Sequence, residues 1–145
     1  FPGGDYDCLR PQSQANTIDF RGRTGYVRTA LEAGVPILPV VSIGGQEDQL
    51  HLTRGEWIAR FSPLRGIMRS EYFPISFGFP FGFTPGFLIN LPLPTKITTQ
   101  VLEPVDITAE FGADPDIAEV DSAIRSRMQD ALDVLASQRR YPVLG

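Results

Sequence analysis

The sequence of 145 residues is poor in the residues that build metal sites and disulfides. It contains one cysteine, Cys8, and one histidine, His51. A single cysteine excludes an intrachain disulfide, and one cysteine with one histidine falls short of the ligand sets of structural zinc sites. We therefore expect neither a disulfide framework nor a metal centre, and a reducing compartment fits this cysteine usage best.

The sequence also lacks clustered positive charge and long apolar runs. Lys96 is its only lysine, the arginines are scattered, and the formal net charge is −4. Such a chain offers no basic surface for a phosphate backbone, so we exclude DNA and RNA as partners. No apolar run reaches the length of about 18 residues that a membrane-spanning helix needs. The hydrophobic fraction of 42% is enough for the core of one ordinary domain.

A helix followed directly by an apolar strand occupies residues 21–45. Apolar residues recur at helical spacing from Tyr26 to Leu31, Gly34 stands where a left-handed C-cap belongs, and Pro36 prevents the helix from continuing. The apolar run at 37–41 predicts an inner strand covered on both faces, as is usual for a parallel strand. The predicted fold class is α/β, with a mixed, partly parallel sheet and flanking helices.

The C-terminal region predicts an edge strand and one long helix. The alternating, β-branched residues 96–101 indicate a half-buried strand at or near a sheet edge. Asp114-Pro115-Asp116 then provides a helix start, and an apolar stripe runs from Ile117 to Leu135. We expect this stripe to pack against the core.

Short motifs follow one another along the chain in a recognisable order. They are Phe1-Pro2-Gly3-Gly4, Arg23-Thr24-Gly25-Tyr26, Pro36-Ile37-Leu38-Pro39-Val40, Leu93-Pro94-Thr95-Lys96-Ile97 and Glu103-Pro104-Val105. In this order they resemble the second half of the glycerolipid acyltransferase superfamily, and within it the branch of the monoacylglycerol and diacylglycerol acyltransferases. The resemblance covers residues 1–107. Each motif alone is weak, and the order makes them specific.

The resemblance implies an enzyme that transfers a fatty acyl group from an acyl-CoA or acyl-carrier thioester to a hydroxyl of a glycerolipid acceptor. It implies no cofactor beyond that donor, and a peripheral position at the cytoplasmic face of a membrane. Residues 1–145 would be the C-terminal part of a single acyltransferase-like domain. The family's catalytic His, five positions before an Asp, precedes the Phe-Pro-Gly-Gly motif and is absent from this sequence. The expectation is that the chain alone is inactive.

His51 does not replace the missing base in this interpretation. It follows the Pro-rich strand, on the wrong side of the motif order, and Glu56 stands five positions later where the family has Asp. We predict that His51 is a surface or loop residue without a catalytic role. Removal of the upstream strands would leave an apolar sheet edge beside residues 37–41, so we expect the chain to self-associate.

The resemblance also implies binding roles for present residues. The acceptor pocket would be formed by Phe1, Pro2, Gly3, Gly4 and Asp5. The superfamily has Glu where this chain has Gly3, so backbone N–H groups or Asp5 would substitute.

Two arginines precede the predicted helix at 25–33, where they would hold a phosphate of substrate or coenzyme A. The alternative for Arg21 and Arg23 is a salt bridge to Asp19 or Glu32. Both interpretations stay open for Arg23, and the salt bridge is favoured for Arg21.

An aromatic segment, residues 72–94, stands out in composition. Interleaved Pro and Gly prevent a helix, so the segment should be extended, with Phe79, Phe81 and Phe83 pointing to one side. It would line a tunnel for an acyl chain, enter a membrane interface, or merely cover the sheet; the resemblance favours lipid contact for these three residues. A short helix is expected at residues 55–61, where Trp57 would be either a core or a membrane-facing residue, and we expect the core.

The alternative to an enzyme is a non-catalytic lipid- or membrane-binding module built on this aromatic segment. An α/β-hydrolase esterase ranks last because the sequence has no Gly-x-Ser-x-Gly motif.

Overall fold

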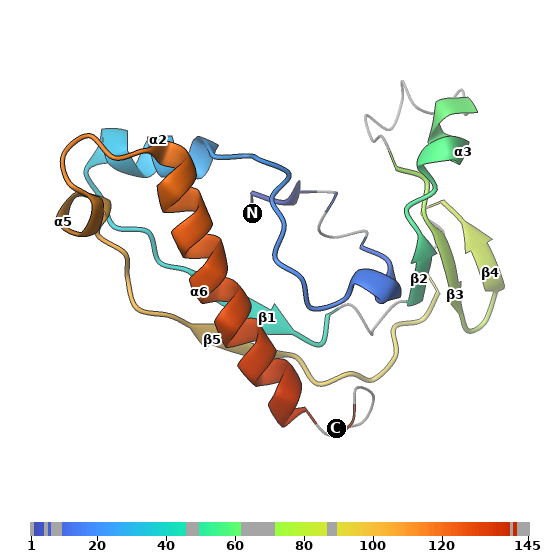
Figure 1. The fold of residues 1–145 in the computed structure, drawn as a ribbon. Helices are drawn as coiled ribbons and strands as arrows, with labels where there is room; N and C mark the ends of the chain where they lie inside the picture. The colour runs from blue at the N-terminus through green and yellow to red at the C-terminus, as the bar shows by residue number, and fades with distance from the viewer. Residues whose placement is uncertain are drawn as a thin grey trace. The chain divides into compact units, whose positions relative to one another are not determined.

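The structure is a computed structural model that describes residues 2–4, 6, 10–45, 50–61, 72–86, 90–139 and 141. Its contacts divide the chain into two compact units. The first unit comprises residues 1–3, 16–43 and 97–139, and the second comprises residues 4–15, 44–96 and 140–145. Each unit has its own small sheet, and the elements are labelled in Figure 1.

The first unit packs helices on a two-stranded antiparallel ribbon. Its elements are α2 (Gly25–Ala33), β1 (Val40–Ile43), β5 (Thr98–Val101), α5 (Ile107–Phe111) and α6 (Ile117–Gln138). In the ribbon, Val40 lies opposite Val101 and Ile43 lies opposite Thr98. The long helix α6 crosses this ribbon in Figure 1 and contacts β1.

The core of the first unit joins α2, α5, α6 and the segment before α5. Its buried members are Val27, Ala30, Val105, Ile107, Val120 and Ile124. The N-cap of α6 is Asp116, whose Oδ1 accepts a hydrogen bond from the backbone N–H of Ala118 at 2.9 Å. The apolar stripe predicted for this helix is confirmed, because it supplies two of the core residues and the partly buried Ile117 and Met128.

The predicted end of the first helix is also confirmed. Gly34 has φ of 63°, in the left-handed region that lacks a steric penalty only for glycine. Its N–H donates to the carbonyl of Leu31, and the N–H of Val35 donates to that of Ala30, both at 3.1 Å. The chain therefore leaves α2 in a Schellman-type turn, and Pro36 follows.

The strand that follows α2 differs from the prediction. The prediction of a strand covered on both faces is wrong, since Leu38 is 54% exposed and Val40 is 43% exposed. The prolines explain the shortened ladder, because neither Pro36 nor Pro39 has an N–H to donate. Pairing is reduced to an isolated bridge from Ile37 to Val105 before β1 begins. Every pairing between the described strands is antiparallel, so a parallel neighbour stays a prediction.

The half-buried strand predicted at residues 96–101 is partly confirmed. β5 forms within that range and pairs with β1, as an edge strand should. All four of its residues are nevertheless exposed, so the prediction of half burial is wrong.

The second unit contains a three-stranded antiparallel sheet of order β2-β3-β4. Its elements are η1 (Gln12–Gln14), β2 (Leu50–Thr53), α3 (Glu56–Phe61), β3 (Ile75–Gly78) and β4 (Gly82–Pro85). The short helix predicted near Trp57 is confirmed as α3. The core position predicted for Trp57 is wrong, because its side chain is 65% exposed.

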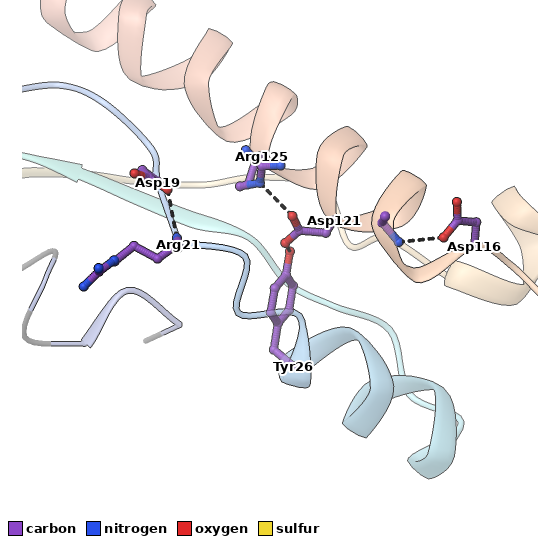
Figure 2. Close-up of polar contacts among 7 residues, drawn as sticks. Asp19, Arg21, Tyr26, Asp116, Asp121 and Arg125 are labelled. Atoms are coloured by element: carbon purple, nitrogen blue, oxygen red, sulfur yellow. Dashed lines mark hydrogen bonds and ion pairs between the residues drawn. The ribbon is translucent and has the colours of Figure 1, made fainter.

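A buried carboxylate connects α2 to α6 in the first unit. Asp121 is only 4% exposed, and its two oxygens accept hydrogen bonds from Tyr26 Oη and Arg125 Nε, each at 2.8 Å. Figure 2 shows Tyr26 reaching this carboxylate from α2. Burial raises the pKa of Tyr26 far above its ordinary value, and the hydrogen bond to Asp121 and the charge of Asp121 raise it further.

This pKa shift predicts how stability depends on pH. The folded state holds the Tyr26 proton more tightly than the unfolded state, whose tyrosine pKa is about 10. The contribution of Tyr26 is therefore complete below about pH 10 and is lost as the pH rises beyond it. Tyr26→Phe should lower the free energy of unfolding at neutral pH by about 1.5–3 kcal/mol, the value of a hydrogen bond to a charged group, and should flatten the decline above about pH 10.

Urea denaturation across a pH series measures both effects. The matched control is Tyr141→Phe, because Tyr141 is 60% exposed. Equal alkaline slopes for wild type and Tyr26→Phe would contradict the assignment.

Candidate functional site

The Phe-Pro-Gly-Gly motif is described at Pro2, Gly3 and Gly4, while Phe1 and Asp5 lie outside the described residues. Gly3 is buried. Gly4 has φ of 53°, a conformation that glycine adopts without strain. The boundary between the two compact units falls between these two glycines. The motif is thus a turn whose backbone conformation depends on glycine, and acceptor binding by residues 1–5 stays a prediction.

Arg23 holds the backbone of this motif. Its Nη1 donates to the carbonyl oxygen of Gly3 at 3.2 Å and to that of Pro2 at 3.4 Å. Arg23 precedes Thr24, the N-cap of α2, so the guanidinium ties the motif to the start of this helix. The structure pairs Arg23 with neither Asp19 nor Glu32, so the salt bridge weighed for it is not formed.

A turn ahead of α2 sets the position of Arg23. The backbone N–H of Arg21 donates to Asp19 Oδ1 at 2.8 Å, as Figure 2 shows, and Arg21 itself has φ of 52°. The N–H of Arg23 then donates to the carbonyl of Phe20 at 3.0 Å. Asp19 is therefore tied to the Arg21 backbone. Phosphate binding by Arg21 and Arg23 stays a prediction.

The β3–β4 hairpin of the second unit has an inverted polarity. Its buried face carries the paired residues Ser76 and Thr84, which are 4% and 3% exposed. Its outer face carries Phe77 and Phe83, which are 45% and 70% exposed, with ring centroids 4.9 Å apart. A sheet on a protein core normally shows the opposite alternation. We call residues 75–85 the aromatic hairpin.

Asn90 satisfies the buried polar side of the aromatic hairpin. Its Oδ1 accepts from the backbone N–H of Phe81 at 3.2 Å, and its Nδ2 donates to Gly82 O at 3.3 Å and Thr84 Oγ1 at 3.1 Å. Asn90 is 4% exposed, so these bonds form away from water, where an unmade hydrogen bond is costly. The side-chain amide therefore fixes which face of the hairpin points outward.

The turn of the aromatic hairpin adds further exposed rings. Phe79 is 73% exposed and Phe81 is 67% exposed. No charged residue occurs in the sequence from Tyr72 to Thr95. Lipid contact by Phe79, Phe81 and Phe83 stays a prediction, and their exposure is the condition that it requires.

His51 was predicted to be a surface or loop residue; it lies in β2 and is partly exposed, so the loop alternative is wrong and the surface alternative is not contradicted. It is the cross-strand partner of Ser76, and its Nδ1 lies 2.9 Å from Ser76 Oγ. Glu56, which follows five positions later, is the exposed first residue of α3. The described residues include no group of three or more His, Cys, Asp or Glu that would hold a metal ion.

Sequence reasoning missed a buried arginine in the second unit. Arg54 is 9% exposed, and its Cζ lies 4.0 Å from the ring centroid of Tyr6. Its Nε also donates to the Tyr6 carbonyl at 3.4 Å, and the Tyr6 ring lies 6.3 Å from that of Tyr72. These residues are far apart in the sequence and follow no local pattern, so only the fold reveals their contact.

The chain matches the family model of diacylglycerol acyltransferase over residues 1–140. The chain belongs to the diacylglycerol acyltransferase family. Human acyl-CoA wax alcohol acyltransferase 2 is 33% identical over 105 residues, which is 71% of this chain and 31% of the human protein. The mouse protein of the same name is 32% identical over 107 residues, or 72% of this chain and 32% of its own length.

An uncharacterized protein of Mycobacterium tuberculosis is 33% identical over 129 residues, covering 86% of this chain and 33% of that protein. The chain thus spans about a third of the length of these relatives. No solved structure matches. The family match confirms the resemblance predicted from the motif order. In the part of the chain that the structure describes, no helix is both long and apolar enough to cross a membrane.

The contact between Arg23 and the family motif can be tested directly. Arg23→Ala removes the donor to Pro2 and Gly3, so amide hydrogen exchange of the motif backbone should accelerate severalfold. Global stability should fall by less than about 1 kcal/mol, because the contact is near the surface. Arg28→Ala is the matched control, since Arg28 is an exposed arginine within α2. Unchanged exchange in the Arg23 variant would show that the motif keeps its conformation without this contact.

Proposed function

We propose that the protein is an acyltransferase that moves a fatty acyl group from an acyl-CoA or acyl-carrier thioester to the hydroxyl of a lipid, with a glycerolipid as the acceptor. The observation that supports this most is the family match over residues 1–140, which includes the turn that Arg23 holds. The name of the human relative, acyl-CoA wax alcohol acyltransferase 2, combines a thioester donor with a hydroxyl acceptor, the two classes of substrate proposed here.

The reaction needs a base and a bound acceptor. The acceptor oxygen attacks the thioester carbonyl, the C–S bond breaks, and the hydroxyl proton leaves through a base to the departing thiolate. We assign the base to a histidine upstream of this sequence, and not to His51, which is hydrogen-bonded to Ser76 within the β2–β3 pair. In this proposal residues 1–5 provide the acceptor pocket, and Arg21 and Arg23 bind a phosphate of the donor or acceptor; the contact of Arg23 with Pro2 and Gly3 supports a place for it beside the pocket.

An activity assay tests this division of roles. The 145-residue chain alone, incubated with long-chain acyl-CoA and acylglycerols, should release no thiol above background. The product of a longer reading frame with the upstream His and Asp should release thiol and form ester. Turnover by the chain alone that disappears on His51→Ala would overturn the assignment of the base. A longer product that binds lipid without any transfer would favour the non-catalytic alternative.

The aromatic hairpin is our proposal for the surface that contacts lipid. Its outward phenylalanines, the uncharged sequence around them and the lipid substrates of the family all support contact with the apolar interior of a membrane or lipid particle. We therefore propose a peripheral position, and the family resemblance adds the cytoplasmic face of a membrane to this proposal. The same surface would serve a non-catalytic lipid-binding module, so the activity assay above separates the two functions.

A double variant tests the lipid contact. Phe81→Ser with Phe83→Ser should weaken liposome binding by at least about tenfold, equivalent to ~1.4 kcal/mol, because two large apolar side chains no longer enter the lipid. The melting temperature should change little, since both side chains are mostly exposed.

The matched control is Leu38→Ser with Val101→Ser, two exposed apolar residues of the first unit. A large melting loss in the phenylalanine variant, without a separate binding defect, would show that the rings stabilise the fold instead.

A further inference from the structure

A pocket of about 400 Å³ lies at the aromatic hairpin, entirely within the second unit. Its apolar lining includes Leu50, Phe77, Leu91 and Leu93, and none of the described residues that line it is charged. Pockets for small ligands commonly have volumes of roughly 300–1,000 Å³, with a mostly apolar lining and few polar groups. Size and composition therefore fit an uncharged, largely apolar ligand.

The polar residues that line the pocket differ in the hydrogen-bonding capacity that remains for a ligand. Asn90 uses both of its N–H donors and its oxygen within the hairpin, so it serves the fold. Ser76 is 4% exposed, and its hydroxyl pairs with His51 Nδ1 at 2.9 Å. A hydroxyl has one donor and two acceptor positions. Ser76 thus retains hydrogen-bonding capacity in a lining that is otherwise apolar or already satisfied.

We propose that this pocket holds one long alkyl chain, with an uncharged oxygen of the ligand bonded to the Ser76 hydroxyl that His51 orients. The described lining residues include no cation, which a phosphate or carboxylate would need, whereas a hydroxyl or ester oxygen needs only a hydrogen-bond partner. Such a chain belongs either to a fatty alcohol or to a fatty acyl ester. The inference deepens the proposed function and rests on it for the lipid nature of the ligand.

The pocket shares Phe77 and Phe79 with the exposed rings of the aromatic hairpin, but it does not include the rings that the double variant removes. Phe81 and Phe83 are not among the residues that line it, although both lie on the same hairpin. A ligand held by the pocket should therefore respond to changes at Leu93 and Ser76. Attachment to a bilayer should respond to changes at Phe81 and Phe83. This separation makes the pocket testable by itself.

The test measures binding of radiolabelled hexadecanol to the 145-residue chain by rapid gel filtration without detergent. Leu93→Trp places a larger ring in the pocket and should weaken hexadecanol binding by at least about tenfold. Ser76→Ala should weaken it about threefold to tenfold, the range for one neutral hydrogen bond. Competition with unlabelled methyl hexadecanoate distinguishes the two ligand sources, since the better competitor identifies the chain that the pocket prefers.

Three controls accompany these variants. Leu38→Trp and Ser42→Ala make the same substitutions at exposed positions of the first unit and should bind as wild type does. The Phe81→Ser, Phe83→Ser double variant should retain hexadecanol binding. If Leu93→Trp fails to fold, Leu50→Phe replaces it. Because the added ring shortens the pocket, this variant should bind the shorter decanol in preference to hexadecanol.

Hexadecanol binding that is unchanged in folded Leu93→Trp or Leu50→Phe and in Ser76→Ala would overturn the pocket assignment, whatever the enzyme activity. Loss of binding in the phenylalanine double variant alone would also overturn it, because the ligand would then sit on the outer face. Absence of acyl transfer in the longer gene product, with pocket binding intact, would instead contradict the proposed function and leave the alkyl-chain site standing.

Discussion

The first unit depends on keeping one buried carboxylate satisfied. A charge removed from water is costly unless it is paired and hydrogen-bonded, and Asp121 achieves this with Tyr26 and Arg125. Because Tyr26 comes from α2 and Asp121 from α6, the pairing holds the two helices together. Arg23 precedes the N-cap of α2 and donates to the Phe-Pro-Gly-Gly turn. The position of the family motif therefore rests, through α2, on this polar contact and the apolar core beside it.

The second unit uses a buried amide in a comparable way. Asn90 makes three hydrogen bonds to the aromatic hairpin, with one to a backbone N–H, one to a backbone carbonyl and one to the Thr84 hydroxyl. In both units a buried polar side chain fixes an element that adjoins or carries residues with a predicted function. A buried network whose members are all satisfied gives a specific arrangement, whereas apolar packing tolerates several.

The sequence predicted those features that depend on local chemistry. The end of α2 at Gly34 and the start of α6 at Asp116 depend only on the conformations of neighbouring residues, so the sequence predicted both. Burial of the strand after α2 was mispredicted because apolar composition cannot report the donors lost at Pro36 and Pro39. The core position predicted for Trp57 was wrong because residue type does not indicate which side of a six-residue helix is buried.

Contacts across long sequence separations could not be predicted at all. Arg23 meets Gly3 across 20 residues, and Arg54 meets Tyr6 across 48. The motif order indicated that Arg23 and the Phe-Pro-Gly-Gly turn belong together, but not that a guanidinium donates to the turn's carbonyls. The described part of the aromatic segment is non-helical and contains two strands, as its prolines and glycines predicted, whereas its inverted polarity could be recognised only from the contacts of Asn90.

The outward rings of the aromatic hairpin follow from its hydrogen bonds. A shift of one residue in the pairing would turn every side chain to the opposite face. That shift would bury Phe77 and Phe83, but it would break the bonds from Asn90. Close packing opposes the shift as well. It would bring a residue with a side chain to the position of Gly78, where a Cβ would lie 2.8 Å from Asn90 Cβ. The hairpin thus keeps apolar surface in water because its polar side is bound more specifically, and contact with an alkyl environment would recover the burial that folding leaves unused.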